Sequence, residues 1–276
     1  MIARTARGVT FSTMFQALSV HPDWLVPAWA APGVGALMTT RHGGVSAAPF
    51  DSFNLRHHIG DAHDAVAHNQ ARLARAADAT PVYLNQVHGA RVVRLDGSDA
   101  VPGARVHDAD ASVTTLAGIA CTVQVADCLP VLFAAPGGRA VGAAHAGWRG
   151  LAAGVLEATL REVCAAAGCE PAQVQAWLGA CIGPGRFEVG ADVLEAMVDS
   201  ARGASRCFVP QAPGKWLADL PQLARDRLLA AGVLAVQGGG WCTVNEASRF
   251  FSFRRDRVTG RMAALVWIRP GGGGAG

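Results

Sequence analysis

The stretch that most constrains how this 276-residue chain folds is residues 127–150, with the sequence DCLPVLFAAPGGRAVGAAHAGWRG. Two short apolar runs, 129–135 and 139–145, flank a Pro-Gly-Gly turn signal, which predicts two strands joined as a hairpin. Pairing brings the outer ends of such strands together. Because Cys128 precedes the first strand and His145 closes the second, we expect a thiol and an imidazole to become neighbours.

A thiol beside an imidazole is typical of two kinds of site. The pair can bind a zinc ion, or it can act as a nucleophile with its base. After His145 the pattern changes at Gly147-Trp148-Arg149-Gly150 to a helical period that runs over residues 151–166. A glycine-flanked helix start leaves backbone N–H groups unpaired. With Arg149 beside them, the sequence predicts a pocket for an anion.

Composition limits the classes of protein to consider. Hydrophobic residues make up 51% of the sequence and charged residues 16%, so the chain can bury the large core of one domain or two closely fused lobes. The net charge is only +3, and no basic stripe with interleaved aromatic residues predicts a nucleic-acid partner. No apolar run approaches the roughly 20 residues of a membrane span. Seven cysteines without a C-x-x-C pair favour free thiols and a cytoplasmic protein.

Predicted strands and helices alternate along the rest of the chain, as in an α/β protein. The predicted strands are 35–40, 81–87, 91–95, 111–115, 119–125, 174–178, 233–236, 250–253 and 262–268. The further predicted helices are 62–77, 191–199 and 220–231. Two more hairpins are expected, 81–87 with 91–95 through a turn at His88-Gly89, and 250–253 with 262–268.

Polar side chains gather in the loops beside these elements. A Gly-Gly loop follows Arg41, and the loop before helix 62–77 carries Asn54, His58 and Asp61. Such loops line ligand sites or form simple turns, and Asp61 is also a candidate cap of the next helix. His88, at a turn, is by itself typical of a solvated histidine.

His88, Cys128 and His145 each fall at a predicted strand end or turn. Metal sites assembled from separate strands have no fixed ligand spacing. The pattern alone therefore leaves a metal site and a purely structural role for these three residues both open.

A resemblance to a known family adds to these predictions. The segments TTRHGGVS, FNLRHHIGD, NQVHG, DADASVT, ADCLPVLF, HAGWRG, LGACIGP, FEVG and FFSFRRDRVTGRMA resemble, in order, the bacterial laccase-domain proteins, also called YfiH-type polyphenol oxidases and more recently purine nucleoside phosphorylases. The resemblance runs from about residue 27 to 268 and excludes residues 1–20. It implies that His88 of QVHG, Cys128 of ADC and His145 of HAGW bind one zinc ion. Asn85-Gln86 stands where the family more commonly has Glu-Gln.

The resemblance also implies a fold and a domain plan. The expected fold is α/β (α+β), with mixed β-sheets packed face to face and helices outside, in α/β/β/α layers. We expect a single catalytic domain over residues 23–269. A flexible N-terminal extension, residues 1–22, precedes it, and a flexible Gly-rich tail, residues 270–276, follows it. A monomer is expected.

The activity that the resemblance implies is phosphorolysis of adenosine, inosine, guanosine and methylthioadenosine to the free base and a sugar 1-phosphate, with adenosine deamination as a side activity. Three protein ligands leave the fourth position of zinc open, as in catalytic sites. We expect Arg41 and Arg149 to contact phosphate, and Asn54 and His58 to contact substrate. Asp127 is expected either to orient a zinc-bound histidine or to cap a turn.

Other classes of function stay open. One is copper-dependent oxidation of phenols, for which copper replaces zinc. A laccase needs several copper ions, and one His-Cys-His set cannot hold them. A second is a metal-free cysteine hydrolase that uses Cys128 and His145. A third is a binding role without catalysis, which a complete set of metal ligands disfavours.

Overall fold

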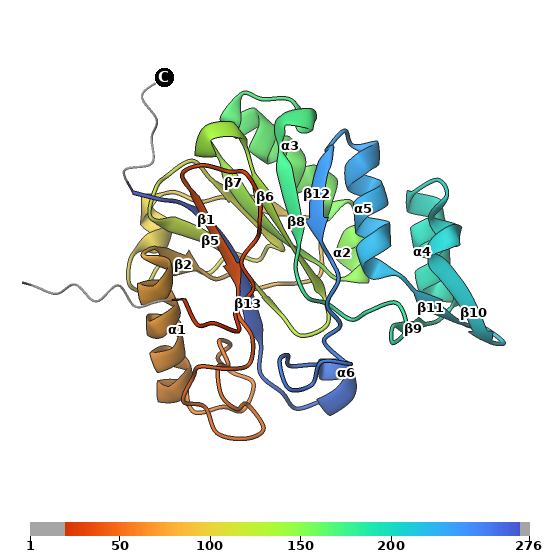
Figure 1. Cartoon of the computed structure of the whole chain (residues 1–276), viewed down its shortest axis with the longest axis horizontal. Coiled ribbons are helices and arrows are strands. Elements are labelled where there is room, and N and C mark those ends of the chain that lie inside the picture. The colour runs from red at the N-terminus through yellow and green to blue at the C-terminus, as the bar shows by residue number, and fades with distance from the viewer. Residues whose placement is uncertain (1–19, 271–276) are drawn as a thin grey trace, which may run out of the picture.

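Two mixed β-sheets pack face to face, with helices on both outer faces (Figure 1). This computed structural model describes residues 20–270. The predicted extension, residues 1–22, and the tail, residues 270–276, lie outside the described part except for residues 20–22 and 270. The predicted α/β class with mixed sheets and outer helices is confirmed.

The first sheet has four strands, in the order β1 (Val34–Met38), β13 (Met262–Ile268), β5 (Ile119–Val125) and β2 (Thr80–Val82). The second has six strands, in the order β12 (Ala235–Gly238), β8 (Gln175–Leu178), β6 (Leu129–Ala134), β7 (Val141–Ala146), β4 (Ala111–Thr114) and β3 (Val92–Arg94). A small third sheet contains β10 (Phe208–Ala212), β11 (Lys215–Ala218) and β9 (Glu188–Val189).

The helices are α1 (His63–Ala77), α2 (Trp148–Ala152), α3 (Val155–Ala167), α4 (Ala191–Ser200), α5 (Leu220–Ala230) and α6 (Phe253–Asp256). The helix α1 covers the outer face of the first sheet, whereas α3 and α5 cover the outer face of the second (Figure 1).

Strand β6 lies at the centre of the molecule and is buried on both faces. Val131 and Phe133 pack toward α3 and α5, whereas Leu132 and Ala134 pack against the first sheet. This separation follows from the two-residue period of a strand. A strand covered on both faces is apolar at every position, which explains why this run contains no polar residue.

The predicted hairpin at the centre of the sequence is confirmed. β6 and β7 pair antiparallel from Leu129↔Ala146 to Ala134↔Val141. The turn between them uses Gly137 and Gly138, whose φ angles are +62° and +67°. Glycine adopts this left-handed conformation without steric cost.

The predicted pairing of 81–87 with 91–95 is wrong. β2 pairs parallel with β5 in the first sheet, and β3 pairs parallel with β4 in the second. The chain between β2 and β3 crosses from one sheet to the other. It does not form a hairpin because the backbone N–H groups of residues 87–89 donate to the carboxylate of Asp110.

The predicted strand 250–253 is also wrong. The side chain of Ser252 accepts a hydrogen bond from the N–H of Arg255 and caps the short helix α6, and a local bond of this kind competes with strand pairing. The partners of β13 are β1 and β5 instead.

The helix predicted at 151–166 is divided. Gly154, with a φ angle of +85°, separates α2 from α3. Helix α1 begins at His63 without a side-chain cap, because the carboxylate of Asp61 accepts hydrogen bonds from Asn54 and from the backbone of Ala62. Strand β12, the last strand of the second sheet in chain order, begins at Ala235, two residues later than predicted.

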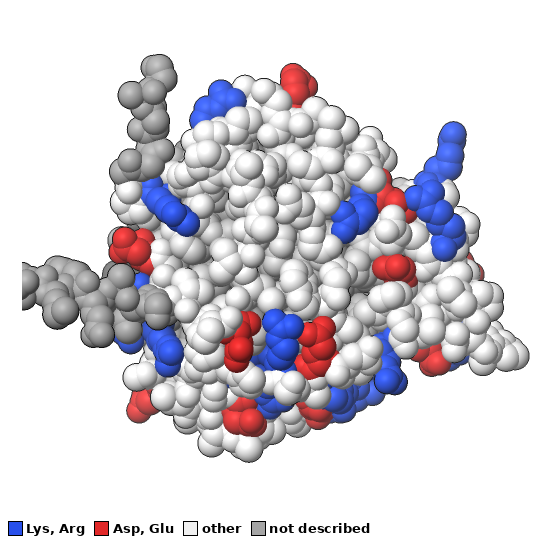
Figure 2. All heavy atoms as spheres, viewed as in Figure 1, with Lys and Arg blue, Asp and Glu red and all other residues white. Residues whose placement is uncertain are grey.

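Over residues 20–270, no helix combines the length and the apolar character that a membrane crossing requires. On the face shown in Figure 2, basic side chains lie beside acidic ones in the lower part, and most of the remaining surface is uncharged.

Candidate metal centre

The three predicted ligands converge on one point. One nitrogen of His88, the sulfur of Cys128 and one nitrogen of His145 all lie within 4.8 Å of one another. Cys128 Sγ is 3.9 Å from His88 Nε2, and the two imidazole rings meet edge to face with centroids 4.9 Å apart. In tetrahedral zinc sites, bond lengths of about 2.3 Å to sulfur and about 2.0 Å to nitrogen separate these atoms by about 3.5 Å. The three donor atoms are therefore spaced more widely than in a loaded zinc site, and the binding of one zinc ion would draw them closer together.

Each ligand comes from a different structural context. Cys128 lies in the short loop that leads from β5 to β6, and His145 lies in β7 opposite Pro130 of β6. His88 lies in the segment that crosses between the sheets, and its φ angle is +62°. A non-glycine residue in this region is uncommon and needs support from its surroundings.

That support comes from Asp110, which the sequence analysis did not single out. Its fully buried carboxylate accepts hydrogen bonds from the backbone N–H groups of Gly89 (2.7 Å), His88 (2.9 Å) and Val87 (3.2 Å). The same carboxylate lies 2.8 Å from Nδ1 of His145. One side chain thus holds the turn that carries His88 and the ring of His145.

The charge state of Asp110 determines the hydrogen bond to His145. Burial raises the pKa of Asp110, but the hydrogen bonds from His145, Gly89 and His88 outweigh burial and lower it below its ordinary value. An ionised carboxylate only accepts hydrogen bonds, so Nδ1 of His145 is the donor and Nε2 is left for a metal. The sequence places Asp110 directly before an apolar strand, where a buried acid is unexpected.

Cys128 and His145 also change each other's ionisation. Burial raises the pKa of the Cys128 thiol, but the charge of His145 and hydrogen bonds from His145 and His88 lower it to about 6. Burial lowers the pKa of His145, but the charge of Cys128 and the contact with Asp110 raise it to about 9. Near neutral pH the metal-free pair is therefore a thiolate beside an imidazolium. A thiolate is the form of cysteine that binds metals.

Gly147 supplies the space beside the ligands. A Cβ atom at this position would lie 2.9 Å from Cys128 Sγ and 3.2 Å from His88 Cδ2. A side chain would therefore displace at least one ligand. This requirement explains a glycine directly before the first turn of α2.

The structure places the two predicted phosphate-binding arginines differently. Arg41 donates from Nε to the carbonyl of Asp51 (3.0 Å) and from Nη1 to that of Ala247 (3.0 Å), and it stacks on Phe251. Arg149 is exposed and stacks on the ring of Trp148, with its guanidinium carbon 4.3 Å from the ring centroid.

The other predicted residues also have distinct positions. Asn54 is fully buried, whereas His58 is exposed with a φ angle of +61°. The carboxylate of Asp127 accepts hydrogen bonds from the Thr243 hydroxyl (2.6 Å) and the Arg254 N–H (2.6 Å). The carboxylate in contact with His145 is Asp110.

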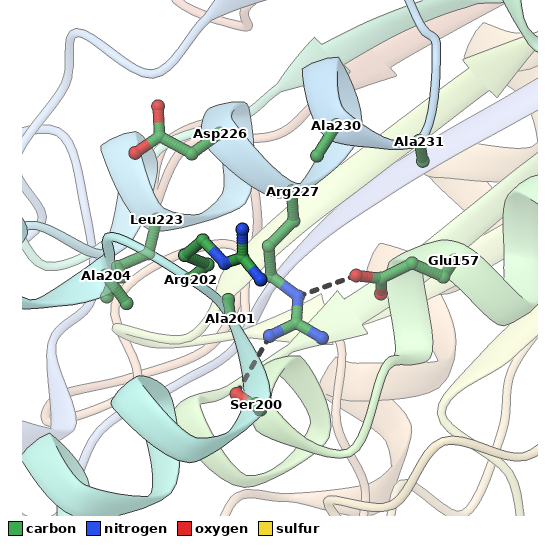
Figure 3. Close-up of a pocket in the computed structure, with 10 residues that line it drawn as sticks. All are labelled: Glu157, Ser200, Ala201, Arg202, Ala204, Leu223, Asp226, Arg227, Ala230 and Ala231. Carbon is green, nitrogen blue, oxygen red and sulfur yellow. Dashed lines mark hydrogen bonds and ion pairs between the residues drawn. The ribbon is translucent and has the colours of Figure 1, made fainter.

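A separate cavity of about 320 Å³, here called the helical cavity, lies between α3, the end of α4 and α5 (Figure 3). Arg227 donates from Nε to Glu157 Oε1 (2.7 Å) and from Nη1 to Ser200 Oγ (3.0 Å). None of the three metal ligands lines this cavity. Its ion pair connects α3 to α5.

Comparison with known proteins identifies the family. A family model described as multi-copper polyphenol oxidoreductase laccase matches residues 35–269. The chain belongs to this family.

Relatives in this laccase-domain family confirm the predicted resemblance. A purine nucleoside phosphorylase of Pseudomonas aeruginosa is 50% identical over 248 residues, which cover 89% of this chain and 98% of that protein. The Escherichia coli protein named purine nucleoside phosphorylase YfiH is 49% identical over 247 residues, covering 88% of this chain and 98% of that protein. A Neisseria meningitidis protein of known crystal structure superposes with a TM-score of 0.84 at 44% identity, covering 90% of this chain and all of that chain.

Proposed function

We propose that the protein is a zinc-dependent purine nucleoside phosphorylase. Its substrates are adenosine, inosine, guanosine and methylthioadenosine with phosphate, its products are the base and the sugar 1-phosphate, and adenosine deamination is a side activity. The observation that carries this proposal is the convergence of His88, Cys128 and His145, with Asp110 behind two of them. The names of relatives about half identical to this chain give the substrate class.

The metal would be held by His88, Cys128 and His145, and when bound it would supply a Lewis acid that activates water and polarises a substrate atom. Asp110 holds the proton on Nδ1 of His145 and so keeps Nε2 directed to the ligand site. The depressed pKa of Cys128 keeps its sulfur in the ligand form at neutral pH.

Phosphorolysis also requires a phosphate below the sugar and contacts to the nucleoside. Arg41 and Arg149 stay predicted phosphate contacts, and Asn54 and His58 stay predicted substrate contacts. Asp127 stays predicted either to orient a zinc-bound histidine or to cap a turn, and its carboxylate accepts hydrogen bonds from Thr243 and Arg254. The cytoplasmic location and the monomeric state also stay predictions.

A specific contact favours one alternative, a metal-free cysteine hydrolase. Cys128, His145 and Asp110 are arranged as a thiolate, an imidazole and an orienting carboxylate, and this is the order of groups in nucleophilic cysteine catalysis. Such an enzyme would hydrolyse its substrate in the presence of a chelator, and zinc would inhibit it.

The decisive experiment incubates the purified protein with a panel of nucleosides, with and without phosphate, and identifies the products by mass. We expect sugar 1-phosphate and free base only when phosphate is present, and inosine from adenosine in both conditions. Activity should disappear with a chelator and return with zinc, and copper should not replace zinc. Metal analysis after growth without added copper distinguishes the two metals. Products that form without phosphate and despite the chelator would reject the proposal in favour of the hydrolase.

A further inference from the structure

Two arginines that the sequence analysis passed over, Arg56 and Arg261, meet near the metal centre. The side-chain oxygen of Asn54 accepts hydrogen bonds from the N–H groups of both Arg56 (3.1 Å) and Arg261 (2.9 Å). The amide nitrogen of Asn54 donates to the carbonyl of Arg56 (3.1 Å) and to Asp61 (2.9 Å). Asn54 is fully buried, so a single rigid amide holds together two segments that are distant in sequence.

The guanidinium groups of this pair keep free donors. Arg261 Nη1 donates to the carbonyls of Thr259 (2.8 Å) and Gly260 (3.1 Å), and within residues 20–270 its Nε and Nη2 have no protein acceptor. The side chain of Arg56 has no hydrogen-bond partner within the same range, and neither arginine is part of an ion pair there. Arg41, by contrast, already donates to Asp51 and Ala247.

Strand pairing places Arg261 beside the metal centre, because Met262 of β13 lies opposite Val125 of β5, three residues before Cys128. Burial and the neighbouring charge of Arg56 lower the pKa of Arg261, whereas Asp127 and Cys128 act in the opposite direction. Two like charges, one of them partly buried, therefore lie on two segments that the Asn54 amide holds together. Such an arrangement is costly unless an anion joins it.

We propose that Arg56 and Arg261 form an oxyanion subsite that binds inorganic phosphate beside the metal centre, positioned by Asn54. The inference rests on the proposed function, because it locates the second substrate of that reaction. A guanidinium presents parallel N–H donors that match two oxygens of a phosphate, and a second guanidinium adds the positive charge that balances a divalent anion. Asn54 contributes as a positioning residue through the hydrogen bonds that hold the two arginine segments.

The test uses the full-length zinc-loaded protein and the variants Arg56→Gln and Arg261→Gln. Equilibrium dialysis with radiolabelled phosphate measures the Kd for phosphate, and steady-state kinetics measures the KM values for phosphate and inosine. We expect each variant to raise the phosphate Kd and KM at least tenfold, while the inosine KM changes less than threefold. Zinc content should remain one per chain. Arg94→Gln is the matched control, because among residues 20–270 the side chain of Arg94 pairs only with Glu162, on the surface.

Lysine variants control for the possibility that a Gln variant loses phosphate binding through misfolding. Arg261→Lys and Arg56→Lys keep the charge and lose the forked donors, so they should bind phosphate between wild type and the Gln variants. If a Gln variant loses zinc or melts at a lower temperature, the phosphate affinity of the corresponding Lys variant is the test of the subsite. The inference is overturned if the Gln and Lys variants of both arginines bind phosphate as tightly as the wild type. It is also overturned if the wild-type protein does not bind phosphate.

The two proposals can fail separately. Phosphate binding that depends on both arginines, without turnover of any nucleoside, would reject the phosphorylase and keep the subsite. Phosphorolysis with an unchanged phosphate KM in both variants would keep the phosphorylase and reject the subsite.

Discussion

The metal centre and the helical cavity both bury charged side chains, but they use them differently. In the metal centre the Asp110 carboxylate accepts four hydrogen bonds, and the ligand atoms of three other residues are left facing one point. In the helical cavity Glu157 and Arg227 neutralise each other (Figure 3). Glu157 Oε2 is buried without a hydrogen-bond partner among the described residues.

The difference shows what identifies a site. Buried ion pairs are common structural features, and their net contribution to stability is small or variable. In the metal centre, the side-chain atoms that could bind a metal converge without binding one another. A bound metal ion there improves the balance of charges. In the helical cavity the two charges neutralise each other through Glu157 Oε1, and the result is a link between helices.

The largest expected effect comes from removing a ligand in the metal centre. Cys128→Ala should weaken zinc binding at least about 100-fold, because structural zinc sites bind by about 10–16 kcal/mol shared among four ligands. Phosphorolysis should fall with the zinc content. Metal analysis after dialysis, together with the nucleoside assay, checks this. A variant that retains zinc and activity would remove Cys128 from the site.

A smaller effect is expected from the residue behind the ligands. Asp110→Asn keeps the shape of the side chain but removes its charge, and changes of this kind typically cost about 10- to 100-fold in metal affinity. Competition with a chromophoric chelator measures the zinc affinity. Asp108→Asn is the matched control, because Asp108 contacts Asn85 and lies outside the ligand set. Equal affinities for both variants would contradict the role of Asp110.

In the helical cavity we expect a substitution to lower the stability of the protein without lowering its zinc content. Arg227→Met removes one partner of an ion pair in which Arg227 is 8% and Glu157 28% exposed. We expect a loss of about 2 kcal/mol in the free energy of unfolding, below the cost of breaking a fully buried pair because Glu157 reaches solvent. Zinc content and phosphate KM should stay unchanged. Urea unfolding measures the stability, and a parallel loss of zinc would show that the two regions are coupled.

The smallest effect compares the thiol of the metal centre with a thiol on α3, the helix that contributes Glu157 to the helical cavity. In metal-free protein the Cys128 pKa is about 6, whereas burial and the neighbouring Cys169 raise the pKa of Cys164 on α3 to about 11. A thiol reacts as its thiolate, which forms as pH rises through the pKa. Alkylation of Cys128 by iodoacetamide should therefore reach half its maximal rate near pH 6 and slow below it, while Cys164 stays unreactive at pH 7. Peptide mass mapping over pH 5–9 checks this, and a Cys128 rate that rises only above pH 8 would contradict it.

Local sequence determined the central hairpin, because a Pro-Gly-Gly turn between two apolar runs leaves few alternatives to the pairing of β6 with β7. That pairing is enough to bring Cys128 beside His145. The helical periods of α1, α4 and α5 were equally legible. His88 could be added only through the family resemblance, because a ligand on a separate segment has no spacing rule.

Only the tertiary structure decided which segments cross between the two sheets. The two wrong hairpins arose because adjacent apolar runs were assumed to pair, while β2, β3 and β13 found partners distant in sequence. The contacts of Asp110, and the Asn54 amide that joins Arg56 to Arg261, exist for the same reason. A buried polar side chain must satisfy its hydrogen bonds within the fold. Its partners are set by how the sheets pack, and the residues next to it in the chain do not reveal them.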